Sequence, residues 1–340
     1  MACLQGKVIK GLRPHNGAQA PATSHLTQTM ILYFLIPLIL IILLYIFLVP
    51  APAVAFYRSV YGRRKVLPPD DPELKRPTME PFMGRLKDDY LYLMSKKPTQ
   101  VSITAADGVV LCGDRYEQNS SKTVLMVHGY NADPYVNLAP QARWFYDNGY
   151  DLLVIYQRGH SKSGGKHTGM GLLEKDDVLQ WADFISKEHP GQKIMIYGIS
   201  MGGTAVAYCS DVITNPDVRC AVIDCGFISP YGQMKRESVR FHLPFRLIAP
   251  YMQAMVKHGL HVDLRERTDD HLKNAKIPIL FLHGDADPTV PLEQAQRNYD
   301  ACGSEKTLVT VADAAHTTAF LTDEAKAARA YIDFMDKYFN

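Results

Sequence analysis

A serine between glycines at the end of an apolar run constrains this chain more than any other stretch. The run is Ile194–Tyr197, and the pentapeptide Gly198–Gly202 follows it with the pattern G-x-S-x-G. A strand that turns sharply into a helix strains the residue at the apex, and flanking glycines keep side chains out of the corner. The pattern therefore predicts a buried strand, a turn with Ser200 at its apex, and a helix over 201–215.

Ser200 in this position would have the surroundings of a nucleophile. Its hydroxyl would stand at the C-terminal edge of a sheet, above the first turn of a helix, where unpaired N–H groups and the helix dipole favour developing negative charge. A serine hydroxyl also needs a base, and the base needs an acid that orients it. In open α/β sheets ligands bind beyond the carboxyl ends of the strands, so we expect both groups there.

Strand and helix patterns alternate from residue 98 to the C-terminus. Strands are expected over 101–104, 109–116, 123–127, 151–156, 193–197, 219–225, 277–283 and 306–311, and helices over 135–148, 172–189, 201–215, 292–302 and 318–338. The Asp107-Gly108 pair is a strong turn signal, so the first two strands should form a hairpin. The expected fold class is α/β: a mostly parallel, twisted sheet with helices on both faces and an antiparallel hairpin at one edge.

The alternation fails over 226–276, which we expect to be an insertion in a catalytic domain that covers 98–340. Three prolines interrupt amphipathic pieces there, and the stretch is too long for a plain connection. We expect a small helical cap over the site. Its apolar residues favour an acyl or aromatic substrate, unless they simply pack on the sheet.

The residues before the catalytic domain divide into three expected segments. Residues 1–29 form a polar tail, 30–49 a transmembrane helix, and 50–97 a proline-rich, charged linker with one short helix. The middle segment has twenty residues without a charge, enough to cross about 30 Å of hydrocarbon. A buried core helix is one alternative. A cleaved signal peptide is another, since Ala53-Val54-Ala55 resembles a cleavage site.

Composition argues against nucleic acid, metal and cofactor. A net charge of +2 gives no electrostatic reason to expect a nucleic-acid partner. The six cysteines show no C-x-x-C spacing, and neither an H-E-x-x-H motif nor a calcium-loop pattern occurs. We therefore expect free thiols, no metal site and no cofactor, with a small molecule and a membrane as the partners.

The acid and the base are expected after the last two strands. Asp287 lies in the loop after 277–283, and His316 lies in the loop after 306–311. The chain order Ser, Asp, His is the one expected for this topology. Alternatives remain for both residues. Asp285 could be the acid, Asp287 could only form an Asx turn or cap the next helix, and His316 could be an exposed loop residue.

Backbone N–H groups of Tyr130 and Met201 are expected to form an oxyanion hole. Tyr130 lies in the turn after the strand 123–127, and Met201 begins the helix after the serine. Three other histidines near strand ends are expected to hold loops rather than transfer protons: His128, His160 and His283.

Five sequence features together make the chain resemble the α/β-hydrolase superfamily. They are HGYN at 128–131, YQRGHSKSGG at 156–165, YGISMGG at 197–203, HGDADPTVP at 283–291 and the lone His316. Over about 98–340 the chain is similar to membrane-anchored bacterial serine hydrolases related to the Bem46 group, and more broadly to the serine aminopeptidase S33-like set. The resemblance implies the α/β-hydrolase fold and serine-hydrolase chemistry. Members of the superfamily include carboxylesterases, lipases, thioesterases and peptidases, so the substrate stays open.

The leading hypothesis is a membrane-anchored serine hydrolase that cleaves carboxylic esters, as carboxylesterases and lipases do, through an acyl-Ser200 intermediate. A serine peptidase, aminopeptidase or amidase is the alternative among enzymes. A catalytically inactive, membrane-anchored binding module is the alternative of another class. Such modules usually lose one member of the catalytic set, and Ser200, Asp287 and His316 are all present here.

Charges beside the apolar segment predict a catalytic domain that faces the cytoplasm. Within about 20 residues, a basic cluster over 58–65 follows the segment, whereas Arg13 alone precedes it, or no charge if translation starts at Met30. Five cysteines after the segment agree, because free thiols persist most easily in a reducing compartment. Export is the alternative, since short N-terminal anchors often carry soluble domains outward.

Overall fold

The structure is a computed structural model that describes residues 23–63, 66–74, 77–240, 242 and 244–340. Its contacts divide the chain into two compact units, Met1–Pro50 and Ala51–Asn340. The described part of the first unit is the helix α1 (Thr23–Leu48), which contains Pro37. The large apolar side chains of α1 from Met30 to Leu44 are exposed.

One helical stretch of the described residues, Met30–Tyr61, is long and apolar enough to cross a membrane, and an 18-residue window within it has a mean hydropathy of 3.1. A signal sequence near an N-terminus can meet the same criterion of length and hydropathy. The helix α1 is therefore a candidate membrane anchor. The span predicted over 30–49 lies almost wholly within it.

The second unit is organised around an eight-stranded sheet of order β1-β2-β4-β3-β5-β6-β7-β8. The strands are β1 (Thr99–Thr104), β2 (Val110–Tyr116), β3 (Lys122–Val127), β4 (Asp151–Tyr156), β5 (Lys193–Ile199), β6 (Val218–Asp224), β7 (Ile279–Gly284) and β8 (Lys306–Val311). Strand β2 pairs antiparallel with β1 and β4, and all other pairs are parallel. The mostly parallel sheet with an antiparallel hairpin at one edge agrees with the prediction from sequence.

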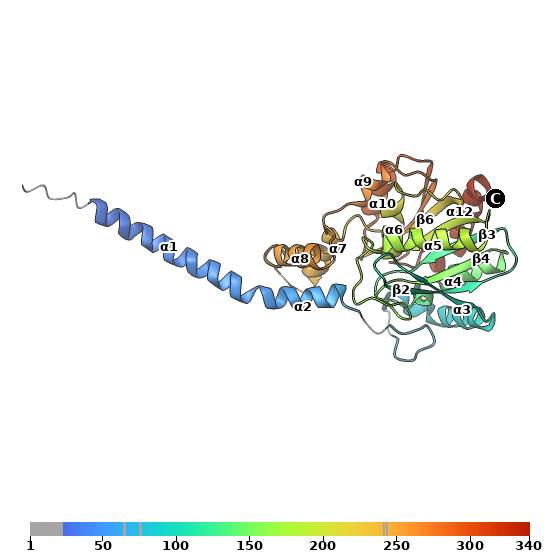
Figure 1. The fold of residues 1–340 in the computed structure, drawn as a ribbon, viewed down its shortest axis with the longest axis horizontal. Helices are drawn as coiled ribbons and strands as arrows, with labels where there is room; N and C mark the ends of the chain where they lie inside the picture. Colours follow the sequence, from blue (N-terminus) through green and yellow to red (C-terminus); the bar gives the residue numbers. More distant parts are fainter. Residues whose placement is uncertain (1–22, 64–65, 75–76, 241, 243) are drawn as a thin grey trace, which may run out of the picture. The chain divides into compact units, whose positions relative to one another are not determined.

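Helices cover both faces of the sheet because its central strands are apolar on both sides (Figure 1). In β3, Val124 and Met126 face one core, and Leu125 and Val127 face the other. The first core is closed by α4 (Pro134–Asp147) and α12 (Glu324–Tyr338), and the second by α5 (Glu174–Glu188) and α6 (Met201–Cys209). The helix α11 (Ala319–Thr322) adds Phe320 to the first core, and α10 (Leu292–Ala301) packs Tyr299 against the second.

Two helix boundaries differ from the sequence prediction for local reasons. The helix α6 ends at Cys209 rather than at residue 215, and the Ser210 hydroxyl bonds back to the carbonyl oxygen of Ala207. The last helix, predicted over 318–338, is divided into α11 and α12. Asp323 separates them, and its side chain accepts a hydrogen bond from the N–H of Lys326, which starts α12 as an N-cap.

Residues 50–97, expected to be a linker with one short helix, contain three helical segments. These are α2 (Pro50–Tyr61), the 3-10 helix η1 (Pro77–Phe82) and α3 (Met83–Ser95). Ala51 and the residues that follow it belong to the second unit. Prolines suggested irregular structure, but proline is well tolerated in the first turn of a helix, where Pro50 and Pro52 lie.

The C-terminal end of α2 packs into the second unit. Tyr61 is fully buried, and its hydroxyl donates a hydrogen bond to the sulfur of Met234. The guanidinium of Arg63, just beyond α2, donates to the carbonyl oxygens of Ser161 and Ser163. The chain after α2 is thus fixed to the loop that follows β4.

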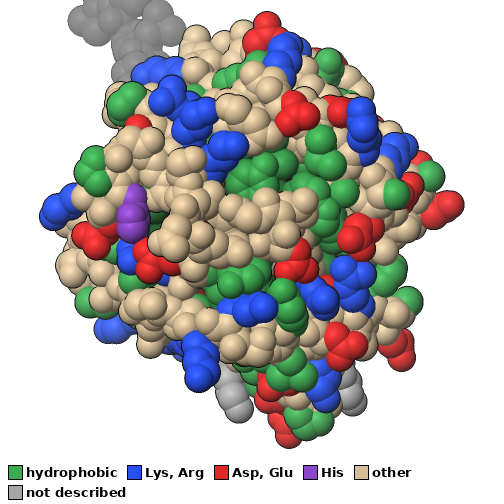
Figure 2. Space-filling model, turned by 90° about the vertical axis from the view of Figure 1, so that its right-hand side faces the viewer, with side chains coloured by type: hydrophobic (Ala, Val, Ile, Leu, Met, Phe, Trp, Pro, Cys, Tyr) green, Lys and Arg blue, Asp and Glu red, His purple; other side chains and the backbone are tan. Residues whose placement is uncertain are grey.

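The residues 226–276, expected to form a helical cap, contain α7 (Pro230–Arg240), α8 (Phe245–Gly259) and α9 (Thr268–Leu272). The helix α9 packs against α6 and α10, and α7 contacts α8. In Figure 1, α2 runs beside α7 and α8. On the face of the unit seen in Figure 2, acidic and basic side chains are interspersed around small apolar patches.

Candidate active site

Ser200 lies between β5 and α6 in a conformation that few residues adopt. Its φ of 54° and ψ of −118° are strained for any residue with a side chain. The strain is held by two backbone hydrogen bonds, since the Ser200 N–H donates to the carbonyl of Asp224 and the Ser200 carbonyl accepts from the N–H of Thr204. The strand, sharp turn and helix predicted from the sequence are therefore present.

The glycines on either side of Ser200 are required by close backbone approaches. A Cβ atom at Gly202 would overlap the carbonyl oxygen of Val127 at the end of β3. A Cβ atom at Gly198 would lie 2.5 Å from the carbonyl oxygen of Gly202. Only glycine fits at both positions, so the G-x-S-x-G pattern reflects the packing of the turn against the sheet.

The structure brings Ser200, His316 and Asp287 into one chain of hydrogen bonds. The Oγ atom of Ser200 lies 2.8 Å from Nε2 of His316, and Nδ1 of His316 lies 2.6 Å from Oδ2 of Asp287. The three residues follow β5, β8 and β7 at the carboxyl edge of the sheet. Their mutual positions result from the strand order, as expected from the sequence.

Asp287 is held in place by the turn that it forms. Its Oδ1 atom accepts hydrogen bonds from the N–H groups of Thr289 and Val290, both at 2.8 Å, while Oδ2 faces His316. The Asx turn and the contact with the histidine therefore coexist. Asp285 is exposed instead, and its Oδ1 atom accepts a hydrogen bond from the N–H of Asp313.

The turn that contains Tyr130 lies against Ser200. A Cβ atom at Gly129 would lie 3.3 Å from the Cβ atom of Ser200, which places Tyr130 beside the apex. The Tyr130 hydroxyl donates to the carbonyl oxygens of Ser59 and Val60 at the end of α2. Met201 is the first residue of α6, where backbone N–H groups have no acceptor within the helix.

Two buried histidines support this turn. The Nε2 atom of His128 accepts from the N–H of Gln157, which leaves Nδ1 to donate to the carbonyl of Gly129. The Nε2 atom of His160 accepts from the N–H of Asn131. Burial lowers the pKa of both imidazoles, well below the usual value in His128, so each acts as a neutral hydrogen-bonding group. Their positions agree with the structural role expected from sequence.

A buried carboxylate at the end of β6 was missed by sequence reasoning. Asp224 is fully buried, and its Oδ2 atom accepts a hydrogen bond of 2.7 Å from the hydroxyl of Tyr197, which also contacts the hydroxyl of Tyr331. Burial raises the pKa of Asp224 to about 6, while the nearby His316 opposes the rise. The available signal was an acid at the carboxyl end of a buried strand next to β5.

The residue after Asp224 also belongs to this region. Among the described residues, Cys225, Asp287 and His316 bring one potential metal-ligand atom each within 4.8 Å of one another. The prediction of no metal site rested on the spacing of residues along the sequence. These three residues follow three different strands, so spacing could not reveal that they lie close together.

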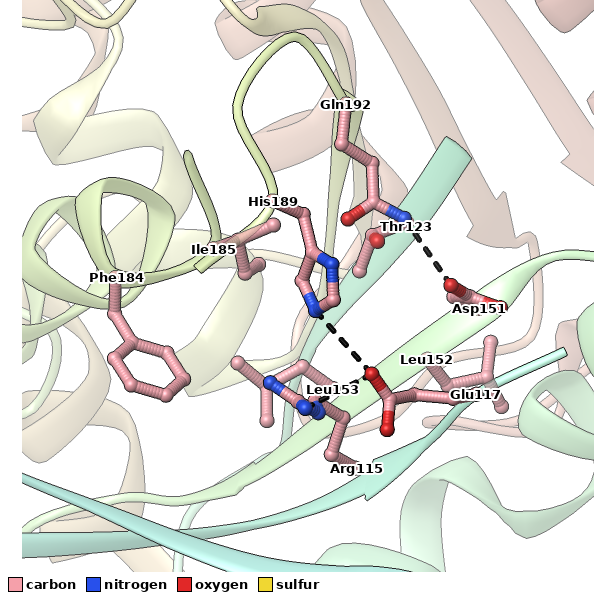
Figure 3. Close-up of a pocket in the computed structure, with 10 residues that line it drawn as sticks. All are labelled: Arg115, Glu117, Thr123, Asp151, Leu152, Leu153, Phe184, Ile185, His189 and Gln192. Carbon is pink, nitrogen blue, oxygen red and sulfur yellow. Dashed lines mark hydrogen bonds and ion pairs between the residues drawn. The ribbon is translucent and has the colours of Figure 1, made fainter. Parts of the chain in front are cut away.

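A small cavity lies at the opposite edge of the sheet, near the start of β3 and β4 (Figure 3). It is lined by Arg115, Glu117 and His189, among others, and His189 pairs with Glu117 at 3.2 Å. The cavity has room for no more than about one water molecule. It is therefore too small to bind a substrate.

Two family models match the chain along most of the catalytic unit. The model described as serine aminopeptidase, S33 matches residues 118–262, and the model described as TAP-like protein matches residues 248–337. The YqkD protein of Bacillus subtilis is 26% identical over 229 residues, which are 64% of this chain and 72% of that protein. Protein bem46 of Schizosaccharomyces pombe is 27% identical over 195 residues, which are 56% of this chain and 60% of that protein.

The fold matches a solved structure over most of both chains. The esterase Pf2001 of Pyrococcus furiosus superposes with a TM-score of 0.60 and 23% identity, covering 82% of this chain and 100% of that chain. Together with the sheet order and the strand-turn-helix at Ser200, this shows that the protein has the α/β-hydrolase fold. Within that fold the chain is similar to the Bem46 protein and to the serine aminopeptidase S33 family.

Asp224 should make the stability of the protein depend on pH. A carboxyl whose folded pKa is raised from 3.8 to about 6 stabilises the fold below pH 3.8, and this contribution is lost as pH rises through 6. The loss amounts to about 3 kcal/mol, the equivalent of roughly two pKa units. Between pH 4.5 and 7.5 the wild type should therefore lose most of this amount of unfolding free energy relative to Asp224→Asn, whose side chain does not titrate. Urea titrations at both pH values measure the difference. A difference that stays constant with pH would contradict the protonation of Asp224 on folding.

Proposed function

We propose that the protein is a serine hydrolase that cleaves carboxylic esters through an acyl-Ser200 intermediate. The observation that carries the proposal is the continuous pair of hydrogen bonds from Ser200 Oγ to His316 and from His316 to Asp287, at 2.8 and 2.6 Å. A nucleophile, a base and an orienting acid in this geometry are what acyl transfer requires. The inactive binding module is not favoured, because no member of the set is missing.

The hydrogen bond to Asp287 determines which nitrogen of His316 acts as the base. When Nδ1 carries the proton and donates to Oδ2 of Asp287, Nε2 is free to accept the proton of Ser200. Ser200 then attacks the ester carbonyl, and His316 returns the proton to the leaving alkoxide. Water, with His316 again accepting a proton, then attacks the acyl-enzyme and releases the carboxylic acid and free Ser200.

Backbone N–H groups of Tyr130 and Met201 would hold the oxyanion of the tetrahedral intermediate. The close approach of Gly129 to Ser200 and the position of Met201 at the start of α6 support this role. Donors that are fixed before the reaction stabilise developing charge without reorganisation. The hydrogen bonds from the Tyr130 hydroxyl to the end of α2 would fix one of the two donors.

The acidic residues of the cap favour an ester over a peptide with a free N-terminus. An aminopeptidase would need a carboxylate to bind the substrate ammonium. Glu266 is paired with Lys175 and His271, and Asp269 is paired with Arg267 and Arg297. The other acids of the cap also interact with protein groups: Asp263, Asp270 and Glu237.

The apolar residues of the cap give less support for an acyl substrate than the sequence suggested. Phe245, Ile248, Met252 and Val256 of α8 are buried within the unit. These four side chains pack inside the unit, whereas Leu247 of the same helix is exposed. The ester preference therefore rests on the engaged acids of the cap and on the esterase named among the similar structures.

The nucleophile is tested by Ser200→Ala. We expect kcat/KM for p-nitrophenyl butyrate to fall by about 10⁴ or more, and labelling by a fluorophosphonate to disappear, because the acyl-enzyme cannot form. The matched control is Ser210→Ala, which alters another buried serine at the far end of α6 and should retain both activities. Labelling that survives Ser200→Ala would overturn the proposal. Hydrolysis of aminoacyl p-nitroanilides in place of esters by the wild type would favour the peptidase.

The acid is tested by comparing two neighbouring aspartates. In Asp287→Asn the amide nitrogen would face Nδ1 of His316 and force the wrong tautomer, so kcat should fall by roughly 10⁴. In Asp285→Asn the side-chain oxygen can still accept from the N–H of Asp313, so kcat should stay within about tenfold of wild type. The reverse order of effects would make Asp285 the catalytic acid.

We further propose that α1 anchors the protein in a membrane with the catalytic unit on the cytoplasmic side. The basic cluster over 58–65 supports this orientation, since positive residues beside a span tend to remain inside. The test is Ser59→Cys, an exposed position in α2, in a background without native cysteines. A membrane-impermeant maleimide should label the residue only after lysis. Strong labelling of intact cells would place the unit outside.

A further inference from the structure

Cys225 lies directly against the candidate catalytic residues, although the proposed reaction does not use it. It follows β6, its N–H donates to the carbonyl of Leu282, and only 2% of the residue is exposed. Its sulfur lies within 4.8 Å of potential ligand atoms of Asp287 and His316, which belong to the loops after β7 and β8. The thiol thus lies beside the proposed acid and base.

Three different ligand types converge at this point. The Cys225 sulfur, a carboxylate oxygen of Asp287 and a ring nitrogen of His316 all lie within 4.8 Å of one another. Thiolate, carboxylate and imidazole are the ligands of protein zinc sites, whereas Mg²⁺ and Ca²⁺ bind sites made of oxygen atoms. A thiolate and a carboxylate also supply two negative charges, which balance one divalent cation in a buried place.

We propose that Cys225, Asp287 and His316 form an inhibitory binding site for Zn²⁺. On binding, the thiol of Cys225 loses its proton to solvent, because a coordinating thiol is deprotonated. Nδ1 of His316, which faces Asp287, releases its proton to solvent and binds the metal ion, while Nε2 takes up a proton from solvent, so the imidazole stays neutral. One proton is released for each metal ion bound.

The consequence for the reaction follows from the tautomer. In the active arrangement Nε2 of His316 lies 2.8 Å from the Ser200 hydroxyl and accepts its proton. With Zn²⁺ on Nδ1, Nε2 carries a proton and can no longer act as a base. The metal ion also binds the carboxylate of Asp287, which otherwise orients the imidazole through a hydrogen bond. Zinc therefore acts as a reversible inhibitor that a chelator removes.

Binding is tested first by a readout that does not depend on catalysis. Co²⁺ substitutes for Zn²⁺ and gives a near-ultraviolet charge-transfer band only when a thiolate is a ligand. The wild type should show this band, and Zn²⁺ but not Mg²⁺ should abolish it. Cys225→Ser should not show the band, and Cys209→Ser, which alters a buried thiol inside α6, should show it. No band in the wild type, or a band that survives Cys225→Ser, would overturn the site.

Inhibition is tested on the same proteins with p-nitrophenyl butyrate in metal-free buffer. Zn²⁺ should inhibit the wild type and Cys209→Ser equally, and EDTA should restore activity. Cys225→Ser should keep its activity without metal and should need about tenfold more Zn²⁺ for half-inhibition. If Cys225→Ser does not fold, Cys225→Ala takes its place in both experiments. Equal inhibition of the Cys225 variant would contradict the proposal. A cobalt band in a protein without esterase activity would leave the metal site standing and remove the proposed function instead.

Discussion

The close approach of Gly202 to the end of β3 is the contact on which the candidate site depends. Because no Cβ atom fits between Gly202 and the carbonyl of Val127, α6 can begin directly above the sheet. That start places Ser200 at the apex and brings Gly129 against it from the next strand. His316 and Asp287 then need only to follow β8 and β7, on the same edge. This one backbone contact thus allows the strand order to bring the three side chains into line.

Strain is concentrated where the strands of this edge end. Ser200, Cys225 and Thr317 all have positive φ values, of 54°, 44° and 64°. Non-glycine residues in this region cost about 1–3 kcal/mol each and persist only where the surroundings hold them. Here the holding groups are backbone hydrogen bonds between β5, β6 and β7, including those from Ser200 to Asp224 and from Cys225 to Leu282. Hydrogen bonds to the rigid sheet thus hold these loop residues in their strained backbone conformations.

The sequence was sufficient for features that depend on local pattern. Apolar runs predicted the buried strands, the glycines predicted the turn at Ser200, and chain order placed Asp287 and His316. It was insufficient where spatial neighbours come from distant segments. Asp224 and Cys225 acquire their surroundings from the pairing of β6 with β5 and β7, which no spacing reveals. The prolines at the start of α2 favour a linker in the sequence, but Pro50 and Pro52 lie in the first turn of the helix, where proline is tolerated.

The hydrogen bonds from Tyr130 to the carbonyls of Ser59 and Val60 have a practical consequence for producing the protein in soluble form. A truncation placed at residue 98, where the strand pattern begins, would remove both acceptors together with the buried ring of Tyr61. The turn beside Ser200 would then lose its outer support. A shortened version should begin before Pro50, so that α2 is kept while the exposed apolar length of α1 is discarded.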